Sequence, residues 1–389
     1  MTRRILFVDH AAVLGGGELC LLDIAAALRD GSAVALFENG PFDSLLVDAG
    51  VTVLRIDTGH SLKSVKKDSR MPSGGAVIAM LRAAAQLARA AKGFDVLYAN
   101  SPKSFLACAA AGVIARRPVI WHLHDILDAA HFSSANIRVL IATANSAAAR
   151  IIANSSATAD AFVAVGGHPS LVRVIHNGIA ADPFDALGTE VGPDVRRSLG
   201  ISNDAYVVGS FSRLHPWKGH RVLLDALTTL PDVHALIVGG ALFSGESDYE
   251  AELRQRAARP EFAGRIHLLG ARSDVPRLMA ACDVIAHTSI LPEPFGRVVV
   301  EALLAERPII ASDAGGVPEI VANGVTGLLV PPGDAPRLAA AIRELRDDPS
   351  RARDLARAGA EDVRRRFTRE GMVAAVAGVV DEVTGGARR

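Results

Sequence analysis

Short runs of β-branched and other apolar residues alternate along most of this chain with longer stretches rich in alanine and leucine. This alternation is typical of βα units, whose parallel strands are buried on both faces by helices. In the first half, strands are predicted at Arg4–Val8, Val34–Glu38, Val51–Ile56, Val96–Asn100, Val119–His122, Ile151–Asn154 and Val172–Ile175. Helices are predicted between them, for example at Gly17–Arg29, Ala76–Ala91, Ser104–Ala115 and Ala135–Arg150. The chain is therefore expected to fold as an α/β protein.

The pattern breaks near Asp182–Gly200, and a second βα series then begins with the segments YVVGSFSRL, HALIVGG, RIHLLG, DVIAHTSI and PIIASD. A chain of 389 residues also exceeds what one hydrophobic core usually serves. We therefore expect two tandem Rossmann-like domains with a central cleft: residues 1–180, a linker at 181–203, and residues 204–368. Residues 369–389 are expected to form a helix that packs back on the first domain. Ligands of such open sheets bind beyond the carboxyl ends of the strands.

Charge and cysteine content exclude several classes of protein. Lys plus Arg and Asp plus Glu both number 42, so the chain lacks the overall positive charge of a nucleic-acid-binding protein. Its three cysteines are too few and too scattered for a disulfide framework, a zinc knuckle or a C-x-x-C pair. The apolar runs are shorter than a signal-peptide core or a membrane span requires. We expect a cytoplasmic protein, and peripheral contact with the inner face of the membrane is left open.

The segment SILPEPFGRVVVEALL, which starts at Ser289, predicts an anion-binding helix start near Gly296. Amides of Phe295, Gly296 and Arg297 would face the anion there. Glu301 lies roughly 7.5 Å farther along the helix, which matches the offset from a diphosphate to the ribose of a nucleotide. Glu293 would face the other side of the phosphates, toward an attached sugar. The alternative is that Glu293 and Glu301 are ordinary solvated acids.

The segment SRLHPWKGH places Arg213 and Lys218 on the turn after the first strand of the second series. Two cations there could neutralise the charge that grows on a departing diphosphate, which is a role often filled by a metal ion. The sequence has no D-x-D pair, so a metal-independent mechanism is favoured, no metal ligands are assigned and no cofactor is expected. Taken singly, each residue is better interpreted as a surface cation, but together with the predicted anion-binding turn they form one site.

Two features mark the first domain. Gly15, Gly16 and Gly17 follow the first strand, where they form either a tight turn or a loop that lets a ligand approach the backbone. In VIWHLHD, period-two alternation puts His122 and His124 on one side of the strand. His124 is nearer the carboxyl end and could bind sugar hydroxyls or relay a proton, although local hydrogen bonds alone could explain both histidines.

Two weaker signals remain. The HNGI segment, His176–Ile179, is interpreted first as a turn and second as a ligand contact. Lys63, Lys66, Lys67 and Arg70 are interpreted first as a solvated loop and second as a patch for anionic lipid or a charged acceptor.

Taken together, these segments resemble the retaining glycosyltransferase family 4, part of glycosyltransferase group 1, which has the GT-B fold. The similarity covers nearly the whole chain and includes the glycine turn, the strand-end His-Asp, the NGI turn, the R-x4-K pair, the E-x7-E segment and GGVPEIV with the following G-x-x-G-LLVPPGD. One departure is visible: Glu306 stands where family members commonly have glycine in an A-x-G-x-P turn. A non-glycine can adopt that turn at some cost in local stability.

The resemblance implies a hexosyltransferase-like enzyme and assigns a role to each candidate residue. Arg213 and Lys218 would bind the diphosphate of a nucleotide-sugar, Glu301 the ribose, and Glu293 the sugar hydroxyls. The amides of Phe295, Gly296 and Arg297 would help to hold phosphate and sugar. From the first domain, His124 with the Gly16–Gly17 turn would close over the sugar.

Two other functions stay open at the level of the sequence. A sugar-nucleotide epimerase or hydrolase of the same shape would need a dedicated acid and base, and apart from Glu293 and His124 no obvious pair is present. A sugar-binding module without activity would be expected to have lost the cations or the glutamates, and all four are present. No motif specifies the donor's base and sugar, the acceptor or the oligomeric state.

Overall fold

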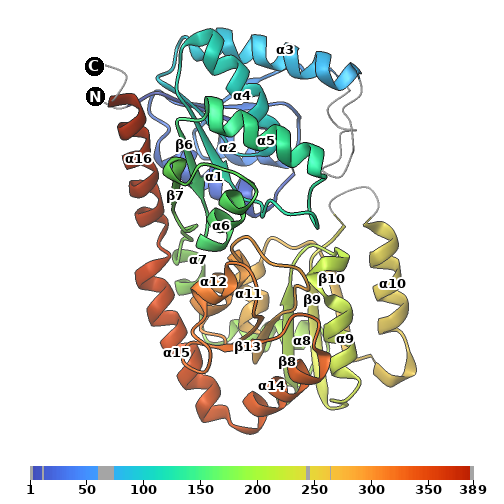
Figure 1. Ribbon diagram of the computed structural model, residues 1–389. Coiled ribbons are helices and arrows are strands. Elements are labelled where there is room, and N and C mark those ends of the chain that lie inside the picture. Colours follow the sequence, from blue (N-terminus) through green and yellow to red (C-terminus); the bar gives the residue numbers. More distant parts are fainter. Residues whose placement is uncertain (1–2, 11–12, 60–73, 242–245, 263, 386–389) are drawn as a thin grey trace. The chain divides into compact units, whose positions relative to one another are not determined.

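The computed structural model describes residues 3–10, 13–59, 74–241, 246–262 and 264–385 (Figure 1). The chain divides into two units: unit 1 comprises Met1–Gly178 with Arg369–Arg389, and unit 2 comprises Ile179–Thr368. Within these described residues, each unit contains one parallel sheet with helices, which confirms the predicted α/β class. The lysines and the arginine predicted as a basic loop, Lys63, Lys66, Lys67 and Arg70, lie outside the described residues.

Unit 1 contains a seven-stranded sheet in the order β3-β2-β1-β4-β5-β6-β7. Its strands are β1 (Ile5–Asp9), β2 (Ala33–Leu36), β3 (Thr52–Arg55), β4 (Val96–Ala99), β5 (Val119–Leu123), β6 (Arg150–Ala153) and β7 (Val172–Val174). Its helices are α1 (Gly16–Ala27), α2 (Pro41–Asp48), α3 (Gly74–Ala91), α4 (Pro102–Ala115), α5 (Ser134–Ala147), α6 (Ser156–Ala164), the 3₁₀ turn η1 (Pro169–Leu171) and α16 (Arg369–Gly385). The seven strands and the helices α1, α3, α4, α5 and α16 match predicted elements except at their ends. Helices α2 and α6 and the turn η1 were not individually predicted.

The alternation of side chains along β1 shows how this sheet is buried on both faces. Ile5 and Phe7 belong to one apolar cluster, and Leu6 and Val8 belong to the other. Helix α16 completes the first of these clusters, although it comes from the far end of the sequence: its side chains there are Met372, Val376, Val379 and Val380. A single strand therefore serves two cores, which explains why its sequence is continuously apolar.

Unit 2 contains a six-stranded parallel sheet in the order β10-β9-β8-β11-β12-β13. Its strands are β8 (Tyr206–Phe211), β9 (Val233–Val238), β10 (Ile266–Gly270), β11 (Val284–His287), β12 (Ile309–Ser312) and β13 (Leu328–Val330). Its helices are α7 (Asp182–Asp185), α8 (Val191–Ser198), η2 (Pro216–Lys218), α9 (His220–Leu227), α10 (Ser247–Ala257), η3 (Pro260–Phe262), α11 (Val275–Ala280), α12 (Arg297–Leu304), α13 (Val317–Ile320), α14 (Ala335–Asp347) and α15 (Pro349–Arg366).

Two details of unit 2 differ from the sequence analysis. The segment 181–203, interpreted as a linker, contains α7 and α8 and is part of unit 2, because Val195 and Ile201 are buried in its apolar core. The edge strand β13 was not predicted, since three residues give no periodicity and its pairing with β12 supplies the structure.

Among the described helices, none is both long enough and apolar enough to cross a membrane.

Candidate active site

The candidate site of unit 2 lies where its strand order reverses. β8 and β11 are hydrogen-bonded neighbours at the centre of the sheet, with the earlier strands on one side and the later strands on the other. The carboxyl ends of two such strands form the usual ligand site of an open parallel sheet. Residues 212–220 follow β8, and residues 288–296 follow β11. The segments that carry Lys218 and Glu293 therefore meet at one place in the fold.

Lys218 and Glu293 form an ion pair at this position. The Lys218 ammonium lies 2.9 Å from Glu293 Oε1 and 2.8 Å from Oε2, and each side chain is only 13% exposed. The Ser289 hydroxyl donates a hydrogen bond of 2.9 Å to Glu293 Oε2, and His287 Nε2 lies 3.3 Å from the same oxygen. The ammonium also sits 4.0 Å from the centre of the Trp217 ring. One carboxylate thus has three polar partners in a largely buried setting.

These partners keep Glu293 ionised. Burial by itself raises the pKa of a carboxyl group, but here the charge of Lys218 and the hydrogen bond from His287 outweigh burial and hold the pKa of Glu293 well below its ordinary value. Glu293 is therefore a permanent hydrogen-bond acceptor near neutral pH, and it cannot serve as a proton donor in its present surroundings.

Two glycines explain why Lys218 and Glu293 meet. At Gly219, φ is 72°, and an added Cβ would stand 1.8 Å from the carbonyl oxygen of Thr288. The two loops are joined there, because Thr288 Oγ1 donates to the Lys218 carbonyl at 2.9 Å. At Gly315, φ is 65°, and an added Cβ would stand 2.1 Å from the Glu293 carbonyl oxygen. Both positions require glycine because another backbone segment occupies the space of a side chain.

Helix α12 begins as predicted. Gly296 is its N-cap with φ of 101°, Arg297 is its first residue, and Glu301 lies one turn farther on. Phe295 is buried in the apolar core below the helix. The Arg297 guanidinium donates to Glu301 Oε1 at 2.8 Å, so the predicted ribose ligand is held by a cation from its own helix. Anion binding by the amides of residues 295–297 stays a prediction.

Arg213 has a different carboxylate partner from Lys218. Its guanidinium lies 3.4 Å from Glu246 Oε1, and Glu246 is buried directly before α10. The sequence analysis predicted two cations acting together on one diphosphate. In the structure each cation instead pairs with its own carboxylate, which balances its charge.

In unit 1, His124 follows β5 and is held by the neighbouring strand. Its Nε2 lies 3.0 Å from Asn100 Oδ1. The Asn100 amide in turn donates to Asp9 Oδ2 at 2.6 Å and to the Gly17 carbonyl at 3.2 Å. A Cβ added to Gly17 would stand 3.4 Å from the His124 ring. The predicted glycine turn and the predicted histidine are therefore adjacent, and Gly16, the first residue of α1, is exposed beside them.

The two histidines at the end of β5 differ as predicted. His122 and His124 lie on one side of the strand with ring centres 3.9 Å apart, and Trp121 and Leu123 belong to the cluster on the other side. His122 is fully buried and bonds to the Tyr98 hydroxyl at 2.7 Å, whereas His124 is partly exposed. Burial lowers the pKa of His124 to about 4, so its imidazole is neutral near pH 7.

Several side chains of the site were not identified from the sequence. His287 and Ser289 follow a predicted strand at the edge where ligands bind, so their position was an available signal. Glu18 accepts a hydrogen bond of 3.0 Å from the Gly15 amide at the start of α1. Its spacing of three residues from the cap was also a recognisable signal. Glu246 gave no signal, because its pairing with Arg213 arises from tertiary contact.

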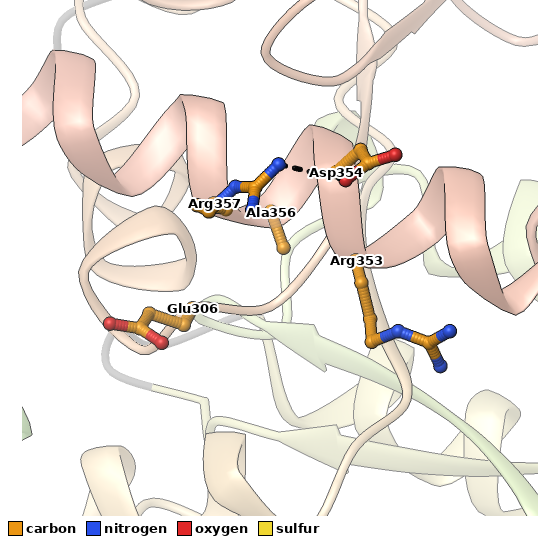
Figure 2. A pocket seen from close by; sticks show the side chains of 5 residues that line it. All are labelled: Glu306, Arg353, Asp354, Ala356 and Arg357. Atoms are coloured by element: carbon orange, nitrogen blue, oxygen red, sulfur yellow. Dashed lines mark hydrogen bonds and ion pairs between the residues drawn. The ribbon is translucent and has the colours of Figure 1, made fainter.

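A separate pocket of about 360 Å³ lies on unit 2 beside α15 (Figure 2). It is lined by Glu306, Arg353, Asp354, Ala356 and Arg357, and none of the candidate site residues contributes to it. Glu306 has φ of 53°, so the residue that departs from the family pattern does adopt the left-handed turn.

Comparison with known proteins divides the chain in a similar way. Residues 15–178 match the glycosyl transferase 4-like domain, and residues 193–362 match the glycosyl transferases group 1. D-inositol 3-phosphate glycosyltransferase of Stackebrandtia nassauensis is 28% identical over 380 residues, which cover 91% of this chain and 84% of that protein. The enzyme of the same name from Mycobacteroides abscessus is 34% identical over 199 residues, and the match spans 44% of its length, somewhat under half.

A solved structure matches more closely over the full chain. Anabaena Alr3699/HepE in complex with UDP-glucose is 39% identical, with a TM-score of 0.89, and the match covers 98% of this chain and 100% of that one. The crystal structure of the same protein with UDP and glucose has 40% identity and a TM-score of 0.88, and covers 97% and 99% of the two chains. From these matches and the two Rossmann-like sheets, the chain belongs to the group 1 glycosyltransferases, enzymes of the GT-B fold with a glycosyltransferase 4-like N-terminal domain.

Proposed function

We propose that this glycosyltransferase moves a sugar from a nucleotide-sugar to an acceptor still to be identified, with retention of anomeric configuration and without a metal ion. The supporting observation is the buried Lys218–Glu293 pair at the carboxyl ends of β8 and β11. A cation and an acceptor side by side match a donor that has a diphosphate joined to a polyhydroxylated sugar. Because the 39% identical Anabaena protein was crystallised with UDP-glucose, UDP-sugars are the first donors to test.

In this proposal the two cations change partners when the donor binds. In the structure, Lys218 pairs with Glu293 and Arg213 pairs with Glu246. A diphosphate carries more negative charge than either carboxylate and offers more oxygen acceptors, so it competes for both side chains. Positive charge held near the leaving diphosphate stabilises the transition state, in which negative charge grows on that group. The same charge makes a divalent cation unnecessary at this step.

Glu293 is assigned to hydroxyl groups of the transferred sugar. Beside Lys218 and His287 its carboxylate is ionised, which makes it an acceptor for sugar hydroxyls. Glu301 is assigned to the ribose, and the amides of Phe295, Gly296 and Arg297 to the phosphate and sugar. In unit 1, His124 and the Gly16–Gly17 turn are assigned to the sugar. Because Nε2 faces Asn100 Oδ1, the imidazole can accept one hydrogen bond from the sugar through Nδ1.

Retention follows if the acceptor attacks from the face that the diphosphate leaves. A phosphate oxygen of the leaving group can take the acceptor's proton, so no protein nucleophile is required. In this route Glu293, which accepts hydrogen bonds from Lys218, is assigned to binding of hydroxyl groups and not to nucleophilic attack.

The experiment is a donor panel followed by product analysis. The purified enzyme is mixed with UDP-, GDP- and ADP-sugars, and binding is measured by thermal shift and by calorimetry, with the free nucleotides as controls. Turnover is then measured with an acceptor panel in the presence of EDTA, and the anomeric configuration of the product is assigned by NMR. Inversion of configuration, or loss of turnover in EDTA that Mg²⁺ restores, would contradict the proposal.

The same panel addresses the alternatives. Epimerisation of the donor or its hydrolysis without transfer would favour the epimerase or hydrolase, which no observation on the site favours at present. Binding without any turnover would favour a sugar-binding module. Cytoplasmic location, with contact at a membrane surface left open, stays a prediction.

A further inference from the structure

A cluster of potential metal ligands lies inside unit 1 and includes His124, one of the candidate site residues. Cys20 on α1, His122 on β5 and His124 directly after β5 offer one ligand atom each, and these atoms all lie within 4.8 Å of one another. Cys20 and His122 are buried, and His124 is partly exposed. About a hundred residues separate the cysteine from the histidines in sequence, so no short metal-binding motif predicts this cluster.

The hydrogen bonds around His124 leave one ring nitrogen ready to act as a ligand. Asn100 donates its amide to Asp9 Oδ2 and to the Gly17 carbonyl, which fixes the orientation of the Asn100 side chain. Asn100 Oδ1 therefore faces His124 Nε2 as an acceptor, and Nε2 must carry the ring proton. His124 Nδ1 is left with its lone pair, buried and without a hydrogen-bond partner among the described residues.

His122 has the same arrangement on its other nitrogen. Its Nδ1 bonds to the Tyr98 hydroxyl at 2.7 Å, whereas its Nε2 is buried and lacks a hydrogen-bond partner in the described part of the chain. Leaving two polar atoms unsatisfied in one buried place is unfavourable. Histidine ligands of metals usually bond through one nitrogen and donate the other to an oxygen atom, as both of these can.

Sulfur atoms complete the cluster. The Cys20 thiol lies 3.3 Å from Asn177 Oδ1 and 3.5 Å from the sulfur of Met372 on α16. Thiolate, thioether and imidazole ligands favour soft or borderline ions over Mg²⁺ or Ca²⁺.

We propose that Cys20, His122 and His124 form a binding site for a thiophilic metal ion, represented by Zn²⁺. In a tetrahedral zinc site the ligand atoms are about 3.3–3.6 Å apart, given zinc–ligand bonds of about 2.0–2.3 Å. The three side chains therefore need to close slightly around the ion, with Met372 or water as a fourth ligand. Coordination by Cys20 converts the thiol to a thiolate and releases one proton to solvent. The ion approaches from the partly exposed side of His124.

This ion is distinct from a catalytic metal. Binding through Nδ1 would fix His124 and withdraw it from the transferred sugar, so Zn²⁺ is expected to inhibit transfer. That consequence rests on the proposed function, whereas metal binding itself does not. A binding assay tests the metal site and an activity assay tests the inhibition, so either prediction can be contradicted without the other.

The test is a Co²⁺ titration of the full-length protein, freed of metal by a chelator and kept reduced under anaerobic conditions. We expect saturation at one ion per chain, thiolate-to-cobalt charge-transfer absorption together with the visible bands of a tetrahedral ion, and displacement by Zn²⁺. Cys20→Ala should abolish the charge-transfer band, and Cys108→Ala, which alters another buried thiol of the same unit, should retain it. Asn100→Ala, which removes the hydrogen-bond partner of a ligand, should weaken binding by about 10- to 100-fold.

The proposal is overturned if the wild-type protein gives no charge-transfer band, or if the band persists in Cys20→Ala. Equal loss in Cys20→Ala and Cys108→Ala would also overturn it, provided that far-ultraviolet circular dichroism shows both variants folded. In the activity arm, Zn²⁺ should inhibit the wild type and spare Cys20→Ala. Binding without inhibition would keep the metal site and remove His124 from the proposed sugar site.

Discussion

Lys218 is the residue on which the proposed reaction depends most. Its replacement by alanine should lower turnover by about 100- to 1,000-fold, the usual loss when one group that stabilises transition-state charge is removed. The matched control is Arg221→Ala, which removes a cation from the same segment: Arg221 is 48% exposed and pairs with Glu252. Steady-state kinetics at saturating donor checks the prediction, and a wild-type rate in Lys218→Ala would remove Lys218 from the site.

The same substitution tests stability, and the two effects must be separated. Removing one partner of a buried ion pair typically costs about 3–5 kcal/mol, because the other charge stays buried. Urea unfolding of Lys218→Ala should show this loss, so kinetics are measured well below its melting temperature. If activity recovers on cooling as the variant refolds, the defect is structural, and the catalytic role is withdrawn.

Glu293 gives a prediction on pH. Its pKa in the fold is lower than the ordinary value of 4.5, so below that pH the unfolded chain binds more protons than the folded chain. The stabilisation is therefore complete above about pH 4.5 and is lost as the pH falls below it. Unfolding in urea between about pH 3 and pH 7 should show a steeper loss for the wild type than for Glu293→Gln. Glu261→Gln, at an exposed glutamate of unit 2, is the control and should follow the wild type.

At the scale of the elements, the site depends on how the loops after β8 and β11 are joined. Gly219 and Gly333 have similar backbone conformations, with φ of 72° and 79°. An added Cβ at Gly219 would stand 1.8 Å from the Thr288 oxygen, whereas at Gly333 it would meet nothing within 4 Å. Gly333→Ala should therefore cost about 1–2 kcal/mol for the left-handed conformation alone. Gly219→Ala should cost more than about 3 kcal/mol and also reduce turnover.

Equal losses in the free energy of unfolding of the two glycine variants, measured in urea, would contradict this prediction. They would mean that the loops rearrange to accommodate the added methyl group, and that the close approach at Gly219 does not hold Lys218 beside Glu293. The two variants are well matched because both glycines belong to unit 2 and have similar left-handed backbone conformations, so the conformational cost of alanine is similar at each.

At the scale of the whole molecule, the two units differ in continuity. Unit 2 is one uninterrupted segment, residues 179–368, whereas unit 1 needs residues 369–389 from the far end of the chain. In α16, Met372, Val376, Val379 and Val380 are buried in a core with residues of β1 and α1. A fragment of residues 1–178 would expose that apolar surface to water.

We therefore expect the fragment of residues 179–368 to unfold cooperatively in heat or urea. The fragment 1–178 should be soluble and cooperative only when α16 is restored, for example by joining residues 369–385 to it through a flexible linker. Circular dichroism and analytical ultracentrifugation check this. If the bare fragment 1–178 unfolds as cooperatively as the joined one, α16 is dispensable for unit 1.

Much of this architecture could be predicted from local patterns. Strands and helices of the first half follow from hydrophobic periodicity, which is set by backbone geometry and needs no tertiary partner. The start of α12 at Gly296 and the placement of His124 rather than His122 at the strand end follow from the same rules. β13 could not be predicted, because three apolar residues gain their structure only from pairing with β12.

The sequence by itself determined the fold class, the family and the residue types at the ends of β5, β8 and β11, since these depend on neighbours in the chain. Tertiary structure alone decided which charges pair, namely Lys218 with Glu293 and Arg213 with Glu246. It also decided that Cys20 lies beside two histidines. Ion pairs and ligand clusters depend on distances of a few ångströms between distant segments. Those distances are set by how loops and helices pack on the sheets, which no local pattern encodes.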